Sequence, residues 1–262
     1  DVLQENVILL LERSAQQDKI TVSTSTDDSF SDLAVHHYPF DQIVLPEDSE
    51  QFIHIPASVE QRTLELGAPV RYSLAELEIG VSTGPVVDFR VKDHLRDMPE
   101  PYTVPLLYPH HFSRHSVVWP IQDAKKPNAI FSIAETRKWL YPNGYYCVVR
   151  RLSSKEEKRR IVASVVDPAM FPNSYLLGFE NHLNVFHHKK GGLPEMVARG
   201  LMVFLNSSAV DDYFRRFNGH TQVNATDLRL LKYPPRALLA ELGEWAKRQT
   251  ELTPRSIDEV YG

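Results

Sequence analysis

Two apolar segments near the start of the chain predict a β-hairpin. Residues 6–13 contain a continuous apolar run at 7–11, which is typical of a strand buried on both faces. Residues 20–25 are rich in β-branched side chains and alternate loosely, which suits a return strand nearer a sheet edge. The polar residues 14–18 are then expected to form the turn between these two strands.

A polar, turn-rich stretch at residues 26–32 predicts a linker after this hairpin. We therefore place a domain boundary near residue 35, which divides the chain into a short unit, 1–35, and a main unit, 36–262. The chain starts at Asp1 and passes directly into a strand-like run. We expect it to be a piece of a longer protein.

The main unit begins with short apolar runs that are separated by proline. The chain has 18 prolines, many of them in this part, and proline cannot donate a hydrogen bond to a sheet ladder. This pattern predicts a loop-rich sheet with irregular edges rather than a repeat or a helical bundle. Strands are expected at 52–56, 81–91, 104–108, 116–119 and 144–151, with a helix from Ser58 through Glu65 after the first. The strand at 81–91 is expected to be interrupted at Thr83-Gly84-Pro85, where glycine permits a tight bend.

The second half of the chain carries apolar residues at helical spacing. The pattern predicts helices at 194–206, 210–217 and 236–249. Ser208 is placed to cap the second helix, and Gly219 to end it. Strands followed by helices indicate an α+β fold, with a proline-rich irregular sheet followed by several helices.

Composition narrows the class of protein. The 262 residues are 42% hydrophobic and 24% charged, as in ordinary soluble globular proteins. The strongly apolar run 7–11 is too short to span a bilayer, and we see no secretory leader. Cys147 is the only cysteine, which excludes an internal disulfide framework and a multi-cysteine metal site. These features predict a cytoplasmic protein with no membrane partner.

Charge is unevenly distributed along the chain. Residues 1–60 hold 12 acidic and 2 basic side chains, whereas residues 61–262 hold 22 acidic and 27 basic ones. A mildly basic body behind an acidic start suits a nucleic-acid-binding protein, although many enzymes carry as much positive charge.

Two basic clusters are candidates for phosphate contacts. Six cations lie within residues 150–160, beside Ser153 and Ser154; the alternative is a solvated face that neighbouring glutamates partly neutralise. The cationic, glycine-containing loop 187–192 is the second cluster, and its alternative is a surface loop without a partner. The phosphate-binding candidates are Arg150, Arg151, Lys155, Lys158, Arg159, Lys189 and Lys190.

A polar segment at residues 217–228 carries amides, an imidazole and hydroxyls between two predicted helices. Asn and Gln can form paired hydrogen bonds with adenine, so exposed members of this segment can contact base edges. For Asn224, Thr226 and Asp227 we favour the alternative that they cap the next helix. His220 and Gln222 remain candidates for base contact.

Catalytic signatures are absent from the sequence. The chain has no Gly-x-Gly, no nucleophile elbow and no P-loop. Its 11 histidines include three adjacent pairs, but no carboxylate or third ligand stands at a recognisable metal-site spacing. Glu156-Glu157-Lys158 contains half of a nuclease core without the acidic strand that completes it. We therefore expect no metal site and no catalytic residue.

Five separated segments of the chain resemble segments of a known protein family and occur in the same order. They are 81–90, 145–157, 200–208, 212–215 and 219–228, the last containing Gly219-His220-Thr221-Gln222-Val223-Asn224. Together they resemble the C-terminal region of bacterial adenine-specific DNA methyltransferases of restriction–modification systems. In this group the target-recognition domain follows the catalytic domain. Residues 1–25 resemble the closing strand hairpin of the catalytic domain's sheet.

Two motifs of that family are missing here. The glycine-rich motif for the methyl donor is absent, and so is the Asn-Pro-Pro-Tyr motif for the target adenine. Residues 167–170 lack the second proline and the aromatic, while residues 232–235 have the residues in the wrong order. The resemblance therefore implies the recognition half, with S-adenosylmethionine and the catalytic residues in an upstream domain of the same polypeptide.

The resemblance also implies double-stranded DNA as partner and assigns loop side chains to base contacts. The base-contact candidates are Arg90, His110, His111, Arg114, His220 and Gln222. Two alternatives remain open. One is a protein-interaction or assembly domain that does not bind DNA, and the other is a metal-dependent nuclease that uses Glu156-Glu157-Lys158.

Overall fold

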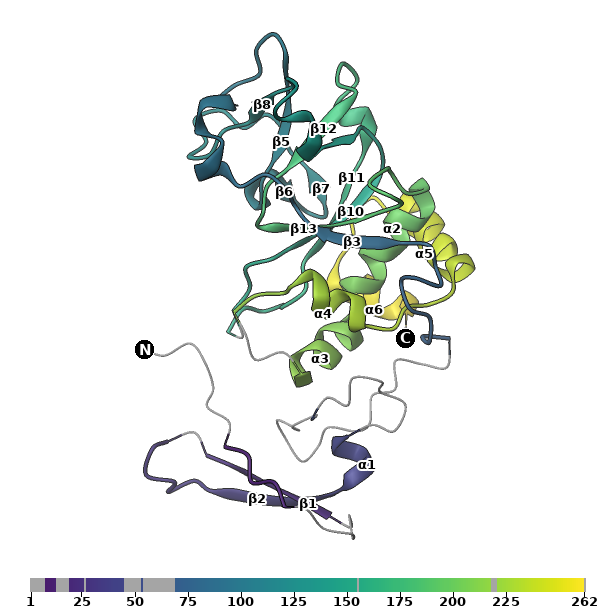
Figure 1. The fold of residues 1–262 in the computed structure, drawn as a ribbon. Coiled ribbons are helices and arrows are strands. Elements are labelled where there is room, and N and C mark those ends of the chain that lie inside the picture. Colours follow the sequence, from purple (N-terminus) through teal and green to yellow (C-terminus); the bar gives the residue numbers. More distant parts are fainter. Residues whose placement is uncertain are drawn as a thin grey trace.

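Two β-sheets and a group of helices form the main body of the molecule (Figure 1). The computed structural model describes residues 8–12, 19–25, 27–44, 53, 69–154, 156–217 and 221–261. In Figure 1 one sheet lies at the top of the body and the helices lie below, with the second sheet between them. This arrangement confirms the α+β class.

The middle sheet has four strands in the order β11-β10-β13-β3, and all its pairs are antiparallel. Its strands are β3 (Gly80–Thr83), β10 (Tyr146–Arg150), β11 (Ala163–Val166) and β13 (Leu183–His187). Side chains alternate between the two faces of a strand. Cys147 and Val149 accordingly pack with the helices, while Tyr146 and Val148 pack with the upper sheet.

The upper sheet has five short strands in the order β4-β8-β5-β12-β9. They are β4 (Leu95–Arg96), β5 (Thr103–Leu107), β8 (Ala129–Phe131), β9 (Leu140–Pro142) and β12 (Leu176–Phe179). Short 3₁₀ turns separate several strands: η1 (Asp88–Arg90), η2 (Lys92–His94), η3 (Pro109–His111), η4 (Arg137–Trp139) and η5 (Pro168–Met170). Strand β12 pairs in parallel with β5, a non-local pairing that brings the loop after β12 beside residue 86.

The helical layer covers the outer face of the middle sheet. Its helices are α2 (Glu195–Leu205), α3 (Ser208–Phe217), α4 (Ala225–Leu230), α5 (Arg236–Arg248) and α6 (Pro254–Tyr261). The predictions of α2, α3 and α5 are confirmed. Helices α2 and α5 meet at two glycines: a Cβ on Gly200 would lie 1.8 Å from the Leu239 carbonyl oxygen, and one on Gly243 would lie 2.0 Å from that of Met196.

The predicted N-terminal hairpin has a different partner strand in the structure. Strand β1 (Lys19–Thr24) pairs with β2 (Ala34–Pro39), and the short helix α1 (Phe40–Ile43) follows. The prediction that 20–25 pairs with 6–13 is wrong: the described residues 8–12 are exposed and form no strand. The polar segment 26–32, predicted as a linker, lies in the connection between β1 and β2. Its turn-forming residues allow the chain to reverse so that these two neighbouring strands pair.

Other sequence predictions have mixed outcomes. The predicted strands 104–108 and 144–151 match β5 and β10, and 116–119 contains β7 (Ser116–Val117). The strand expected at 81–91 was predicted to be interrupted at Thr83-Gly84-Pro85, and β3 does end at Thr83. The second part of the run is not a strand and contains the turn η1. The helix expected from Ser58 through Glu65 lies outside the described residues. Among the residues that are described, no helix is long and apolar enough to cross a membrane.

Candidate nucleic-acid interface

The end of strand β10 carries the two adjacent arginines of the first basic cluster. Arg150 lies on the face of the sheet that carries Val148, and its guanidinium pairs with the carboxylate of Glu157. A cleft of about 200 Å³ opens beside Arg150. The residues that line this cleft are Pro109, Phe112, Arg114, His115, Val148, Arg150, Val162, Ser164 and Leu183.

Arg114 reaches the same cleft from a hairpin that is distant in sequence. Strands β6 (Phe112–Ser113) and β7 flank a tight turn at Arg114 and His115, which have φ angles of 47° and 66°. Two successive positive φ angles are typical of a type I′ hairpin turn. The turn is attached to β11, because Val165 N donates to the His115 carbonyl at 2.9 Å. The structure thus brings the predicted residues Arg114 and Arg150 together.

Arg151 and Gln222 are also neighbours in the structure. The segment 221–223 runs antiparallel to 151–153: Val223 N donates to the Arg151 carbonyl at 2.8 Å, and Ser153 N donates to the Thr221 carbonyl at 3.1 Å. Arg151 also donates through Nη1 to the Asn181 carbonyl at 3.3 Å. These bonds hold the predicted phosphate contact Arg151 and the predicted base contact Gln222 at one end of the middle sheet.

The loop between β12 and β13 lies against these arginines and adds an imidazole that the sequence analysis did not single out. Arg151 N donates to the His182 carbonyl at 2.8 Å, and Asn181 N donates to the Val86 carbonyl at 2.9 Å. We name the surface formed by Arg114, Arg150, Arg151, His182 and Gln222 the strand-end surface. Nothing in the local sequence marks His182, because its position depends on the non-local pairing of β12 with β5.

Arg90 lies in the turn η1, four residues after Val86, and its side chain is exposed. Its guanidinium carbon is 5.5 Å from the ring centre of Phe89, which is also exposed. In the same turn Asp88 accepts from Lys126 Nζ at 2.6 Å. That hydrogen bond is the main reason why the pKa of Asp88 is lowered, and His182 contributes a smaller part. Arg90 therefore belongs to a charged turn next to the strand-end surface.

His111 is a buried structural side chain, which corrects its assignment as a base contact. It is 0% exposed, its Nδ1 accepts from Tyr108 N at 3.0 Å, and its Nε2 lies 2.9 Å from Asn128 Oδ1. Because Nδ1 is an acceptor, Nε2 carries the proton and donates to the amide oxygen. Burial lowers the pKa of His111 to about 4. The neighbouring His110 is exposed at one side and stacks on Tyr108 at the other. Partial desolvation of its ring lowers the pKa of His110 as well.

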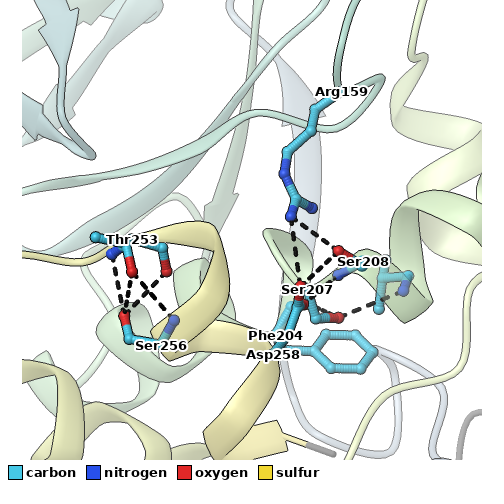
Figure 2. Close-up of polar contacts among 8 residues, drawn as sticks. Arg159, Phe204, Ser207, Ser208, Thr253, Ser256 and Asp258 are labelled. Atoms are coloured by element: carbon cyan, nitrogen blue, oxygen red, sulfur yellow. Dashed lines mark hydrogen bonds and ion pairs between the residues drawn. The ribbon is translucent and has the colours of Figure 1, made fainter.

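Arg159 is bonded within the helical layer rather than presented to solvent (Figure 2). Its Nη2 donates to Ser208 Oγ at 3.0 Å and lies 3.9 Å from Asp258 Oδ2. Asp258 in turn accepts from Ser208 N at 2.7 Å, so Arg159 connects the start of α3 to α6. The geometry gives Arg159 a structural role in place of the expected phosphate contact. Lys158 beside it is exposed.

The two lysines of the second basic cluster lie away from the first. Lys189 and Lys190 are exposed at the tip of a tight turn after β13, with φ angles of 47° and 65°. Strand β13 starts beside Arg150 and runs away from it, so the turn lies at the opposite end of the middle sheet. At about 3.3 Å per residue, the length of β13 separates the two clusters by roughly 16 Å. Two further candidates, Lys155 and His220, lie outside the described residues.

Other predictions concern caps and metals. Asn224 N donates to Asp227 Oδ2 at 2.8 Å at the start of α4, which confirms that Asp227 acts as a cap. Val210 N donates to Ser207 Oγ at 3.3 Å, so Ser207, and not the predicted Ser208, caps α3. Within the described part of the chain, no group of three or more His, Cys, Asp or Glu side chains is arranged to hold a metal ion.

Comparison with known proteins gives two close relatives, and no family model matches the chain. The chain is 55% identical over 251 residues to Type II methyltransferase M.BsuBI of Bacillus subtilis, an alignment that covers 96% of this chain and 50% of the relative. It is 46% identical over 262 residues to Type II methyltransferase M.PstI of Providencia stuartii, covering 99% of this chain and 51% of the relative. The homologues of this chain are thus bacterial Type II methyltransferases, and the chain spans about half of their length.

Proposed function

We propose that this chain recognises a specific double-stranded DNA sequence as the target-recognition part of an adenine-specific DNA methyltransferase in a restriction–modification system. The homology to Type II methyltransferases supports the enzyme class. The absence of a glycine-rich donor motif and of an Asn-Pro-Pro-Tyr motif from the sequence supports a division of labour. In this proposal an upstream catalytic domain of the same polypeptide binds S-adenosylmethionine and transfers the methyl group to adenine.

The observation that carries the proposal is the convergence at the strand-end surface. Three segments that are far apart in sequence deliver Arg114, the adjacent pair Arg150 and Arg151, and Gln222 to one end of the middle sheet. Arginines supply charge-assisted hydrogen bonds to phosphate, and a glutamine amide can bond to the edge of adenine. A surface of this kind holds the duplex in register while another domain acts on one base.

The chemistry explains why such a surface is needed. An enzyme that methylates a base must extrude it from the duplex, which costs a few kcal/mol of stacking and pairing. Phosphate contacts supply free energy of binding by releasing counterions, and base contacts select the sequence. The charged residues of the strand-end surface fit the first task and Gln222 the second. The turn Lys189–Lys190 lies outside this surface, and its phosphate role stays a separate prediction.

The exposed apolar run near the start of the chain supports a partner domain. Ile8 and Leu10 are 91% and 96% exposed, and Leu9 and Leu11 beside them are exposed too. A contiguous exposed apolar patch is typical of an interaction site. We propose that residues 8–12 pack against the catalytic domain, in agreement with the resemblance of residues 1–25 to part of its sheet.

Binding to a mixed pool of double-stranded oligonucleotides at two salt concentrations tests the proposal. We expect binding that weakens as salt rises and enriches one short adenine-containing site. Binding with equal affinity to every duplex would refute sequence recognition. Binding that is absent at low salt would favour an assembly domain, and metal-dependent cleavage of the pool would favour a nuclease.

Arg151→Ala is the first variant to examine. We expect about tenfold weaker binding to all duplexes and a salt dependence reduced by about one unit of log–log slope, because one phosphate contact is lost. Arg255→Ala is the matched control, since Arg255 is an exposed arginine on α6 whose ion pair with Glu259 contributes little to stability. Equal binding by the two variants would contradict the role of Arg151.

A further inference from the structure

The loop between β12 and β13 holds a fully buried carboxylate against an exposed imidazole. Glu180 is 0% exposed, and its Oε1 lies 2.7 Å from His182 Nδ1. Its second oxygen accepts from His182 N at 2.9 Å. The imidazole itself is 40% exposed, so the pair runs from the protein interior to the surface.

This pairing fixes how the imidazole faces solvent. A buried carboxylate is costly unless it is paired and hydrogen-bonded, and His182 supplies a hydrogen-bond donor to each oxygen of Glu180. An ionised carboxylate only accepts hydrogen bonds, so Nδ1 donates and Nε2 is left as the outward atom. In the doubly protonated ring Nε2–H is a second donor, and it points outward, where an anion such as a phosphate can accept from it.

The charged groups around His182 place it within the strand-end surface. On the side of β10, Arg151 binds the loop through its backbone N–H and its guanidinium. On the side of η1, Asp88 interacts electrostatically with His182, but the Asp88 carboxylate is already paired with Lys126. His182 is therefore flanked by one cation and by one neutralised pair, and its buried partner is Glu180.

We propose that His182 donates from Nε2 to a DNA phosphate, and that Glu180 is the positioning residue that orients the ring. The inference rests on the proposed DNA-binding function and adds a contact to it. Among the hydrogen bonds of the described residues, both carboxylate oxygens of Glu180 bond only to His182. The Glu180 carboxylate therefore links no other described part of the chain by hydrogen bonds, and the proposal explains why a carboxylate is buried there.

The test measures binding of the 262-residue chain to the enriched duplex and to an unrelated duplex, at about pH 6 and about pH 8. We expect His182→Gln to bind both duplexes about tenfold more weakly than the wild type at the lower pH. The difference should shrink at the higher pH, because only a doubly protonated ring can donate from both Nδ1 and Nε2. His182→Gln keeps an exposed polar side chain, and an unchanged melting temperature would verify the fold.

Glu180→Gln tests the positioning role. A glutamine can still accept from Nδ1 but forms no ion pair with a doubly protonated ring. We therefore expect Glu180→Gln to bind as weakly as His182→Gln at the lower pH and like the wild type at the higher pH. A variant that merely loosens the loop would weaken binding equally at each pH and would overturn this role.

The possible results distinguish a failure of the His182 contact from a failure of the proposed DNA-binding function. If His182→Gln binds like the wild type while Arg151→Ala binds weakly, the inference is overturned and the proposed function stands. If the loss is confined to the enriched site, the phosphate assignment is overturned in favour of a base contact. If the wild type binds no duplex, both are overturned.

Discussion

Asp211 provides a sharp test of how the basic turn after β10 is held in place. This residue lies in the first turn of α3 and is 4% exposed. Its Oδ1 accepts from two backbone N–H groups, Arg160 N at 2.7 Å and Ile161 N at 3.0 Å. Its Oδ2 accepts from Arg215 Nε at 2.8 Å. One carboxylate thus fastens the end of the turn to the helical layer.

The two oxygens allow the cost of each substitution to be worked out separately. Asp211→Ala leaves two buried N–H groups without their acceptor, each costing about 1–3 kcal/mol, so we expect a loss of about 4 kcal/mol in the free energy of unfolding. Asp211→Asn can keep an oxygen at the Oδ1 position and loses only the bond from Arg215. Because Arg215 is 30% exposed, that loss is about 1 kcal/mol.

Urea denaturation of both variants measures the difference as a shift of the midpoint at constant slope. Asp212→Ala is the matched control, because Asp212 is the next residue on α3 and is exposed. We expect that variant to lie within about 0.5 kcal/mol of the wild type. Equal destabilisation by Asp211→Ala and Asp211→Asn would refute the assignment of the two oxygens.

Three further predictions follow from the interior of the protein. Gly200→Ala places a Cβ against the Leu239 carbonyl and should force α2 and α5 apart, lowering the free energy of unfolding by about 2–3 kcal/mol in urea denaturation; an unchanged midpoint would contradict the close helix contact. His111 has its pKa lowered by burial to about 4, so the unfolded chain binds a proton that the folded chain lacks between that pH and the ordinary value of 6.5. Stability should therefore fall as pH is lowered from about 6.5 to about 4, and His111→Gln should flatten that slope in denaturation at a series of pH values. Cys147 is buried and burial raises the pKa of its thiol, so an aromatic disulfide reagent should label it only after denaturation; rapid labelling of the native chain would contradict its place in the core.

The elements that the sequence predicted correctly are those whose apolar pattern is complete within the element itself. The apolar stripe of α2 and the apolar run of β10 are recognisable because each buries the same face along its whole length. The strands β8, β9 and β12 were missed because they are three or four residues long and are stabilised by pairing with distant segments. The run 6–13 was misassigned because an apolar pattern indicates burial but does not indicate which strand a segment pairs with.

The candidate site was predictable in its residue types but not in its geometry. Arg150 and Arg151 were expected at the end of a strand, and Arg114 and Gln222 in two separate loops. The sequence carries no sign that these residues meet. His111 was expected to be exposed, because the resemblance placed it among the loop side chains that contact bases. Its burial depends on Asn128, 17 residues away, whose amide oxygen accepts a hydrogen bond from the ring N–H.

Amide hydrogen exchange on the chain, with and without the enriched duplex, locates the DNA-binding surface most directly. We expect added protection in the segments that form the strand-end surface, 112–116, 150–154, 180–183 and 221–223. Protection confined to the helical layer, or to the turn that carries Lys189 and Lys190, would contradict the assignment of the DNA-binding surface.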